Sequence, residues 1–584
     1  MLHECIDILD GEYGEKLEQM IIDNYIPKDG IYYIYKKIGN GFEQTTEPIT
    51  IKYDKKQNIL LGREHSQFHN VCQWDYYSKI IDTNKCIVNK KIHSNNYLSF
   101  FVKQENVLNN EITDDMIEKY FDILANPYLK YTKAKQKEIY DATSANIRKL
   151  DPCEIQQIAD FIKEELPRIK ESLKNPKEYL KIFIEAPIED YQAEGKRYLI
   201  PNIYNSADYN VNINGKIYGL PNDNMGLNSK KPYLENKTRK VRVPYLIDSE
   251  HVYRQKLLFD YLATLATKGT YNVFFSIDPM AYQRITAIRD DGMLEEPFCG
   301  IYLRLQVGKA LEIIHTDHIT QYEPKLKRPF ELHNVLDVDY LEDENSSKFY
   351  GEITSVKEMK DLLNTVLYNK FLSSHFFTKP EDIPVKGTVL KQNIVYSRDR
   401  VFAWLYKSDE TSVDTVMERV TKRMIESNIS DGYLKKASHQ FNLRCSLQEY
   451  FHKGERSMAD VMIQIRETLK DKIISEVDEA IQSDEEYYFA VGQLVNYFIS
   501  LSKTKKKMHS LANPFFNAKK DSILKTKLEH CFKQYNYAIA TNRVRFNKLY
   551  SMVASYQPDG VVLSDYMIAG YLTKCFIFYK SNEK

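Results

Sequence analysis

Basic residues concentrate in two stretches of a chain that is neutral as a whole, with 81 Lys and Arg residues against 81 Asp and Glu residues. Residues 216–242 hold seven basic and two acidic residues, and residues 503–548 hold twelve basic and two acidic residues. Lysine and arginine neutralise phosphates and release counterions, so their binding to nucleic acid weakens steeply with salt. The two stretches therefore predict contacts with nucleic acid.

The first stretch has the composition of an irregular loop. Gly219 and Gly226 let the backbone approach a ligand closely, and Pro221 and Pro232 oppose a regular helix. Asparagine side chains can bond to base edges while the cations hold phosphates. A solvated surface loop is the alternative. The candidate contacts with duplex DNA are Asn222, Asn224, Asn228, Lys230, Lys231, Lys237, Arg239, Lys240 and Arg242.

The second stretch follows an acidic segment, residues 471–486, which holds seven acids and one lysine. This separation of charge along one region predicts a basic face suited to the backbone of a single strand. Lysine-rich helix surfaces that serve only solubility are the alternative. The candidate backbone contacts are Lys505, Lys506, Lys507, Arg543, Arg545 and Lys548.

No set of residues has the spacing of a catalytic centre. His315, Asp317 and His318 are the densest group of metal-ligand types, but no second group accompanies them. Asp337 and Asp339 could hold Mg²⁺, although a solvated acidic loop is the simpler interpretation. No phosphate-binding loop or nucleophile motif occurs. We therefore expect no catalytic residue, metal or cofactor, with a metal-dependent nuclease as the alternative.

Cysteine usage and hydropathy indicate a cytoplasmic protein. The eight cysteines are widely spaced and include no C-x-x-C pair, which argues against a zinc ribbon or a disulfide framework. The first residues are acidic, unlike a signal peptide, and no apolar run is long enough to span a membrane. The 44 tyrosines fit the codon bias of an A·T-rich genome, with base stacking as the second interpretation.

The pattern of apolar residues predicts an α+β fold, with antiparallel strands and helices in a mixed α/β N-terminal and central body. Short alternating runs between residues 30 and 102 read as antiparallel strands, and residues 112–180 read as helices that Pro167 ends or bends. Strands are expected again at residues 181–188 and 271–277, and residues 300–314 are expected to form a hairpin.

Helical spacing dominates from about residue 410 to the end and predicts an antiparallel bundle. We expect a body over residues 1–410, a helical linker region over 411–457 and a small bundle over 458–584. The clearest stripe recurs every four residues, at Val461, Ile465, Leu469, Ile473, Val477 and Ile481.

Several segments together resemble the large subunit of the type I-B CRISPR Cascade. They are Gly219–Lys240 (GLPNDNMGLNSKKPYLENKTRK), Glu486–Lys503, His509–Lys519, Arg545–Asp559 and Ile568–Leu572. The resemblance implies a non-catalytic subunit that helps to recognise the protospacer-adjacent motif and opens the duplex. It also implies that the subunit holds the displaced strand and recruits a helicase-nuclease, while guide pairing reads the sequence.

The resemblance also implies the partners of the chain. They are crRNA, target double-stranded DNA with its displaced strand, the Cascade backbone and small subunits, and the recruited helicase-nuclease. Some relatives carry a cysteine-rich zinc element in the middle region, but no cysteine lies between Cys153 and Cys299, so we expect no zinc here. An RNA-binding scaffold unrelated to defence remains the alternative.

Met458 is a candidate internal start. The C-terminal bundle of the family resembles the Cascade small subunit, which some relatives also make separately. Residues 453–456 can be encoded by a purine-rich stretch that resembles a ribosome-binding site. Translation from Met458 would yield residues 458–584, whereas an ordinary apolar methionine is the alternative.

Overall fold

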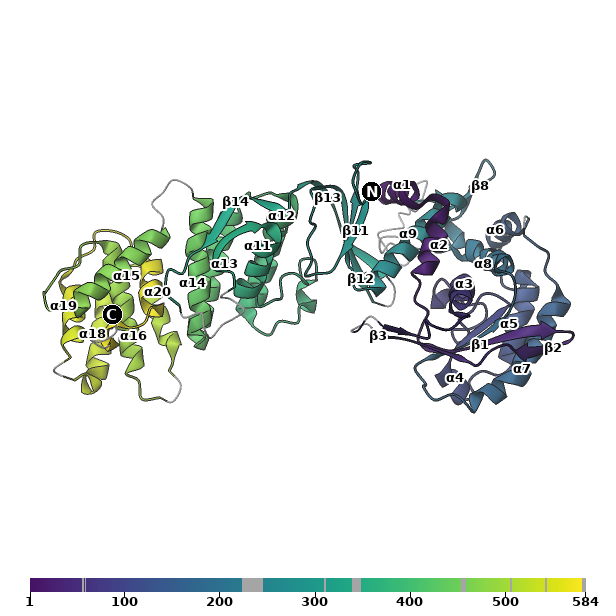
Figure 1. Cartoon of the computed structure of the whole chain (residues 1–584), viewed down its shortest axis with the longest axis horizontal. Coiled ribbons are helices and arrows are strands. Elements are labelled where there is room, and N and C mark those ends of the chain that lie inside the picture. The colour runs from purple at the N-terminus through teal and green to yellow at the C-terminus, as the bar shows by residue number, and fades with distance from the viewer. Residues whose placement is uncertain are drawn as a thin grey trace. The chain divides into compact units, whose positions relative to one another are not determined.

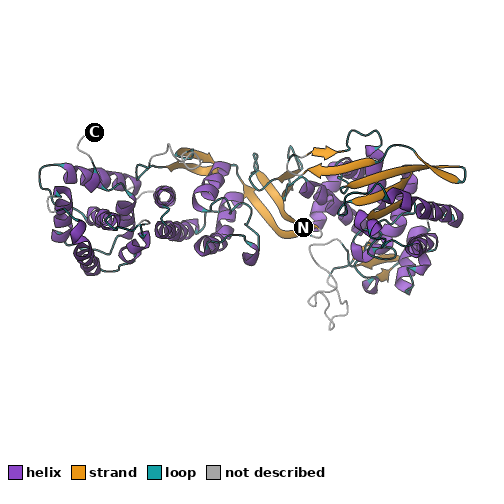
Figure 2. Cartoon of the chain, turned by 90° about the horizontal axis from the view of Figure 1, so that it is seen from below, coloured by secondary structure: helices purple, strands orange, loops and turns teal. Residues whose placement is uncertain are grey.

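The computed structural model divides into two compact units (Figure 1). Unit 1 comprises Met1–Arg289 and Gly300–His318, and unit 2 comprises Asp290–Cys299 and Ile319–Lys584. The structure describes residues 1–54, 57, 59–145, 147–222, 245–308, 311–338, 348–452, 458–504, 507–540 and 543–579. Unit 1 combines helices with most of the strands, whereas unit 2 is mainly helical (Figure 2).

The main sheet of unit 1 has the order β4-β3-β1-β6-β5, with β2 paired to β1. All neighbours are antiparallel except β1 and β6, which run parallel with Gly30 opposite Tyr179. The strands are β1 (Gly30–Ile38), β2 (Gly41–Gln44), β3 (Ile49–Asp54), β4 (Ile59–Leu61), β5 (Ser99–Lys103) and β6 (Tyr179–Ile184).

Helices pack on both faces of this sheet because successive residues of β1 point in opposite directions. Tyr35 lies 4.8 Å from the Phe161 ring on one face, and Tyr32 stacks on Phe183, which contacts Trp74 on the other. The helices of unit 1 are α1 (Leu2–Tyr13), α2 (Leu17–Asp23), α3 (Phe68–Ser78), α4 (Gln104–Leu108), α5 (Asp114–Ala125), α6 (Ala134–Ser144), α7 (Pro152–Lys170), α8 (Ile188–Asn202) and α9 (Ser249–Thr267).

Two smaller sheets follow in the chain. One has the order β11-β10-β12-β13 and contains the predicted hairpin, because β12 (Phe298–Val307) pairs with β13 (Leu311–Tyr322). Its other strands are β10 (Asn272–Ser276) and β11 (Ile285–Ile288). The other sheet has the order β7-β8-β9, with β7 (Val211–Ile213), β8 (Lys216–Gly219) and β9 (Ile247–Asp248).

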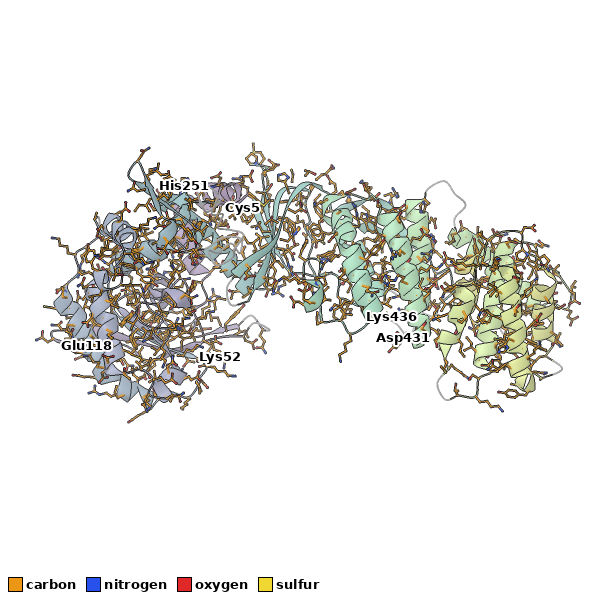
Figure 3. All side chains as sticks on the ribbon, turned by 180° about the vertical axis from the view of Figure 1, so that it is seen from behind. Cys5, Lys52, Glu118, His251, Asp431 and Lys436 are labelled. Atoms are coloured by element: carbon orange, nitrogen blue, oxygen red, sulfur yellow. The ribbon has the colours of Figure 1, made fainter. Side chains whose placement is uncertain are left out.

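Unit 2 begins with a strand pair, β14 (Lys325–Leu332) and β15 (Gly351–Ser355), and continues as helices. Gly432, with φ 84°, ends α13 in the left-handed conformation that favours glycine, and Asp431 and Lys436 flank this turn (Figure 3). The helices are α11 (Val356–Leu362), α12 (Thr388–Lys407), α13 (Val413–Asp431), α14 (Leu434–Phe451), α15 (Met458–Ile474), α16 (Asp484–Ser500), α17 (Asn513–Phe516), α18 (Asp521–Tyr535), α19 (Val544–Ser555) and α20 (Ser564–Leu572).

The predicted α+β class with a helical C-terminal region is confirmed, and several local predictions need correction. Residues 85–92, which belong to the alternating runs predicted as strands, form no strand. Among them only Ile92 makes a bridge, to Val102. Pro167 lies inside α7, which continues to Lys170. The helical C-terminal region begins at Val356, well before residue 410. Helix α15 ends at Ile474, which leaves Val477 65% exposed.

Candidate nucleic-acid interface

The first basic stretch lies mostly outside the described residues. Its start is β8, and Pro221 forms a bridge with Tyr204. The backbone N–H of Asn222 donates to the carbonyl oxygen of Ile203 over 2.8 Å. Asn222 is half-buried, and this hydrogen bond holds the start of the stretch against unit 1. The other candidates, which lie outside the described residues, are Asn224, Asn228, Lys230, Lys231, Lys237, Arg239, Lys240 and Arg242.

Three of the candidate cations in unit 2 bond to carbonyl oxygens of their own chain. Lys507 donates to Ser500 over 2.8 Å and also to Ser502. Arg545 donates to the carbonyl of Tyr579, and Lys548 donates to Ser475 over 3.0 Å. These bonds satisfy backbone acceptors at or just beyond the ends of helices, so the three side chains stabilise the adjoining loops. Lys505 and Lys506 lie outside the described residues.

Two further cations of this stretch lie over aromatic rings. The guanidinium of Arg543 is 5.5 Å from the centre of the Phe578 ring, and the ammonium of Lys503 is 4.8 Å from that of Tyr537. Cations in such positions are attracted by the negative face of the ring. Tyr537 is 65% exposed, so Lys503 and Tyr537 together present a charge and an aromatic surface to solvent.

Four lysines on and just before α18 make no ion pair or hydrogen bond through their side chains with any described residue. Lys519 and Lys520 precede the helix and are exposed, Lys527 is half-exposed, and Lys533 is exposed near its end. Ile523, in the first turn of α18, is 42% exposed and adds an apolar side chain to this basic surface. We call these four residues the α18 lysines; the sequence signal that could have found them is their density, four lysines within fifteen residues.

The N-terminus of α18 adds to this positive charge. No side chain caps the helix at Lys520, and the helix dipole places partial positive charge there. Asp521 in the first turn is engaged elsewhere, because it accepts from Tyr487 Oη over 2.6 Å and lies 3.6 Å from Lys525 Nζ. The start of α18 therefore favours an anion such as phosphate.

The acidic segment before α16 is partly used inside the protein. Glu486 forms a buried ion pair with Lys472 over 2.8 Å. Asp484 accepts from Tyr556 Oη and from the backbone N–H of Gly560, each over 3.0 Å. Glu476, Asp478 and Glu479 stay exposed. The acidic segment also contacts the basic stretch directly, because Lys548 lies 3.6 Å from Asp478 Oδ1.

The described residues contain no group of three His, Cys, Asp or Glu side chains placed to hold a metal ion. His315 Nε2 and Asp317 Oδ2, the pair that the sequence singled out, are 3.9 Å apart on β13. The second pair cannot be assessed as a pair, because Asp337 is described and Asp339 is not. Within the described ranges, none of the helices is both long and apolar enough to cross a bilayer.

Met458 is the first residue of α15 and packs, half-buried, on the core of unit 2. That core also includes Phe441 and Cys445 of α14, which precede the candidate start. Arg444 of α14 pairs with Asp565 of α20 over 2.8 Å. A chain that begins at Met458 would therefore begin with the first residue of α15 but would lose the contacts that α14 makes with the core.

We expect the native gene to yield a C-terminal fragment that begins at Met458, in addition to the full chain. Replacing Met458 by isoleucine should remove the fragment and leave the full chain at its normal level, because isoleucine can occupy the same half-buried apolar position. Immunoblotting with a C-terminal tag measures both products. Absence of the fragment, or its persistence in the Met458→Ile variant, would refute internal initiation at this codon.

Comparison with known proteins gives no assignment. No protein-family model matches the chain, and neither the curated proteins nor the solved structures include a match.

Proposed function

We propose that the chain is the non-catalytic large subunit of a type I-B CRISPR Cascade surveillance complex. In this role it helps to recognise the protospacer-adjacent motif, opens target DNA, holds the displaced strand and recruits the helicase-nuclease. The resemblance of residues 219–240 and of the segments after residue 486 supports the assignment. An α+β region followed by a helical one is the order of parts that the resemblance implies.

The observation that carries the nucleic-acid part of the proposal is the set of α18 lysines. Their ammonium groups have no acidic partner among the described residues, so they can pair with phosphates without first breaking an internal ion pair. Lys503 and Tyr537 add a cation and a ring of the kind that binds single strands. Lys507, Arg545 and Lys548 would have to leave backbone carbonyls to do the same.

Replacing the four α18 lysines, Lys519, Lys520, Lys527 and Lys533, by glutamine should weaken binding of single-stranded DNA and flatten its salt dependence. Each lost phosphate contact should reduce the slope of log K against log salt by about 0.7. Fluorescence anisotropy with a labelled oligonucleotide over a series of salt concentrations measures both quantities.

A matched control changes four exposed lysines elsewhere in unit 2, Lys357, Lys370, Lys379 and Lys386, to glutamine. This variant has the same net charge, so the general attraction of the protein for DNA changes equally. If both variants lose affinity and slope to the same extent, the α18 lysines are not the binding face.

The Cascade assignment itself is tested by co-expression. The tagged chain, produced with the products of its neighbouring genes, should purify with crRNA and the Cascade backbone subunits. Incubation of the pure chain with DNA or RNA and Mg²⁺ or Mn²⁺ should give no cleavage. Cleavage would favour a nuclease, and a gene neighbourhood without a repeat-spacer array would favour an unrelated RNA-binding scaffold.

A further inference from the structure

Unit 1 contains a cavity of about 620 Å³ between α2, α3, β6, α8 and α9. Its volume falls in the range of about 300–1,000 Å³ that is usual for sites of small molecules. Five lysines and three carboxylates line it: Lys28, Lys79, Lys181, Lys196 and Lys256, and Glu18, Asp82 and Asp260. The cavity is therefore polar and carries an excess of positive charge.

Lys79 occupies an unusual position in this cavity. Its ammonium lies 4.6 Å from the centre of the Tyr25 ring and 4.5 Å from that of the Tyr76 ring. The nearest carboxylate oxygen, on Asp260, is 3.9 Å away, beyond hydrogen-bond distance. No described residue accepts a hydrogen bond from the Lys79 ammonium. The side chain is 31% exposed, so the ammonium is open to an acceptor that a ligand in the cavity would supply.

The carboxylates near Lys79 are already engaged by other groups. Asp260 Oδ2 accepts from Tyr76 Oη over 2.6 Å and also from Lys256. Asp75, behind the cavity wall, accepts from Lys181 over 2.6 Å and from Tyr25 Oη over 3.0 Å. These contacts leave Lys79 with Asp260 Oδ1, at 3.9 Å, as its nearest carboxylate oxygen.

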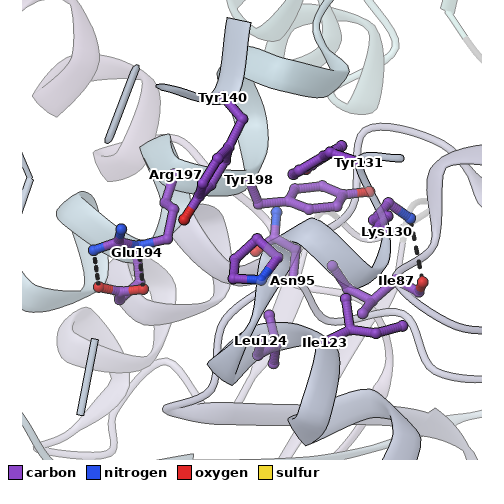
Figure 4. A pocket seen from close by; sticks show the side chains of 11 residues that line it. Ile87, Asn95, Ile123, Leu124, Lys130, Tyr131, Tyr140, Glu194, Arg197 and Tyr198 are labelled. Carbon is purple, nitrogen blue, oxygen red and sulfur yellow. Dashed lines mark hydrogen bonds and ion pairs between the residues drawn. The ribbon is translucent and has the colours of Figure 1, made fainter. Parts of the chain in front are cut away.

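Two other half-buried lysines of unit 1 bond to carbonyl oxygens of the chain, whereas Lys79, which is also half-buried, does not. Lys85 donates to the carbonyls of Tyr204 and Asn205, each over 2.9 Å. Lys130 donates to the carbonyls of Cys86 and Ile87 beside a second cavity of only about 20 Å³ (Figure 4). That small cavity has room for about one water molecule. Chain carbonyls thus satisfy these two lysines, but not Lys79.

The backbone holds Lys79 in a fixed place. Its N–H donates to the carbonyl of Asp75 over 3.0 Å at the end of α3, and its own carbonyl accepts from Asn95 Nδ2 over 2.9 Å. Burial lowers the pKa of the Lys79 ammonium, as expected for a cation that lacks a close acceptor. The backbone of Lys79 is therefore fixed, and the Tyr25 and Tyr76 rings attract its ammonium before any ligand arrives.

Exposed cations and apolar walls define what the cavity can accept. Lys28 and Lys196 line it, are exposed, and have no side-chain partner among the described residues, so with Lys79 they suit a doubly charged phosphate. Tyr253, Phe259 and Leu199 supply apolar and aromatic surface suited to a flat ring. We propose that this cavity binds a nucleoside phosphate, with its phosphate on Lys79 and its base against these walls.

This site is separate from the nucleic-acid face of the proposed function and does not depend on it. The ligand could be a free nucleotide or the 5′-phosphorylated end of a strand, because both present the same chemistry. Isothermal titration calorimetry of the full chain tests it, with AMP, CMP, GMP, UMP, inorganic phosphate, and tetranucleotides with a 5′-phosphate or a 5′-hydroxyl as probes.

We expect at least one nucleoside monophosphate to bind at a one-to-one ratio and more tightly than inorganic phosphate. A tetranucleotide that binds more tightly than the mononucleotide, and only when 5′-phosphorylated, identifies a strand end as the source; the reverse order identifies a free nucleotide. Lys79→Gln should weaken binding by about tenfold or more, since a hydrogen bond to a charged group contributes about 1.5–3 kcal/mol. Lys137→Gln, at an exposed lysine of α6, should leave binding unchanged.

Thermal unfolding separates a binding role from a structural one. Because Lys79 loses only its contacts with the two rings and the distant Asp260, Lys79→Gln should lower the melting temperature only slightly. The double variant Lys28→Gln/Lys196→Gln should weaken binding while folding normally. The α18 lysine variant should bind the nucleotide as the unmodified chain does. The proposal is overturned if no nucleotide binds, if inorganic phosphate binds equally well, or if Lys79→Gln changes only the melting temperature.

Discussion

Replacing Asp75 by alanine should lower the free energy of unfolding of unit 1 by about 3–5 kcal/mol, because it leaves a buried charge without its partner. The side chain of Asp75 is fully buried and that of Lys181 is 4% exposed, and their charged atoms are 2.6 Å apart. Lys181 also lies 4.6 Å from the centre of the Phe101 ring. Few polar groups could replace the lost carboxylate at this position.

The chain offers a direct measurement, because it has two tryptophans, Trp74 in unit 1 and Trp404 in unit 2. In a Trp404→Phe background, denaturant unfolding followed by fluorescence reports on unit 1. The double variant Asp75→Leu/Lys181→Met should recover most of the loss, since an apolar pair of similar volume avoids the cost of burying charge. If Asp75→Ala costs less than about 1 kcal/mol, the pair contributes no more to stability than an exposed ion pair does.

The loss in Asp75→Ala should shrink as pH rises. Burial lowers the pKa of Lys181 in the folded protein, so the unfolded chain binds more protons between the folded and unfolded pKa values. Stability therefore increases with pH across that window, and removal of Asp75 widens it by lowering the folded pKa further. Unfolding curves of both proteins at a series of pH values from neutral upward measure this difference; a loss that grows with pH would contradict it.

Replacing Gly492 or Gly570 by alanine should destabilise unit 2 by more than about 3 kcal/mol, beyond the usual cost of overpacking. A Cβ at Gly492 would lie 2.1 Å from the carbonyl oxygen of Met567, and one at Gly570 would lie 2.0 Å from that of Phe489. Each glycine thus lets α16 and α20 approach through their backbones. The gain of about 1 kcal/mol that alanine brings to a helix cannot offset such a clash.

Far-ultraviolet circular dichroism and Trp404 fluorescence in a Trp74→Phe background measure the effect on unit 2. Gly387→Ala is the matched control, because a Cβ there would meet only Leu390 Cβ, at 3.8 Å. We expect the control to unfold close to the unmodified chain. Equal behaviour of the three alanine variants would show that α16 and α20 can separate at little cost.

Helices with a regular apolar stripe could be predicted from the sequence, whereas their ends could not. Ile465, Leu469 and Ile473 are buried on α15 as their spacing indicated, but the same spacing extended the stripe to Val477, which lies in the following loop. The spacing of apolar residues indicates which of them could share a helix face. It does not show where the helix ends, because the same spacing can continue into the following loop. The parallel pairing of β1 with β6 also escaped prediction, because about 140 residues separate the strands.

The sequence predicted which regions carry the charge of the candidate sites, but not which side chains face solvent or lie together. The sequence located the region of the α18 lysines but gave no means to tell Lys527, which faces solvent, from Lys548, which bonds to Ser475. No local pattern in the sequence indicated the cavity around Lys79. Its side chains come from segments between Glu18 and Leu311, and a lysine beside two tyrosines in space has no distinctive neighbours in the chain.

The segments of the two units alternate along the chain, which limits where the chain can be cut or recombined. The chain passes from one unit to the other three times, near residues 289, 299 and 318. Strand β12 returns Ile301 and Leu303 to the core of unit 1, while the buried Lys360 of unit 2 donates to the carbonyls of Asp290 and Gly292. No single break in the gene therefore separates two complete halves. Recombination or proteolysis at any one of these points leaves at least one unit without a segment that completes it.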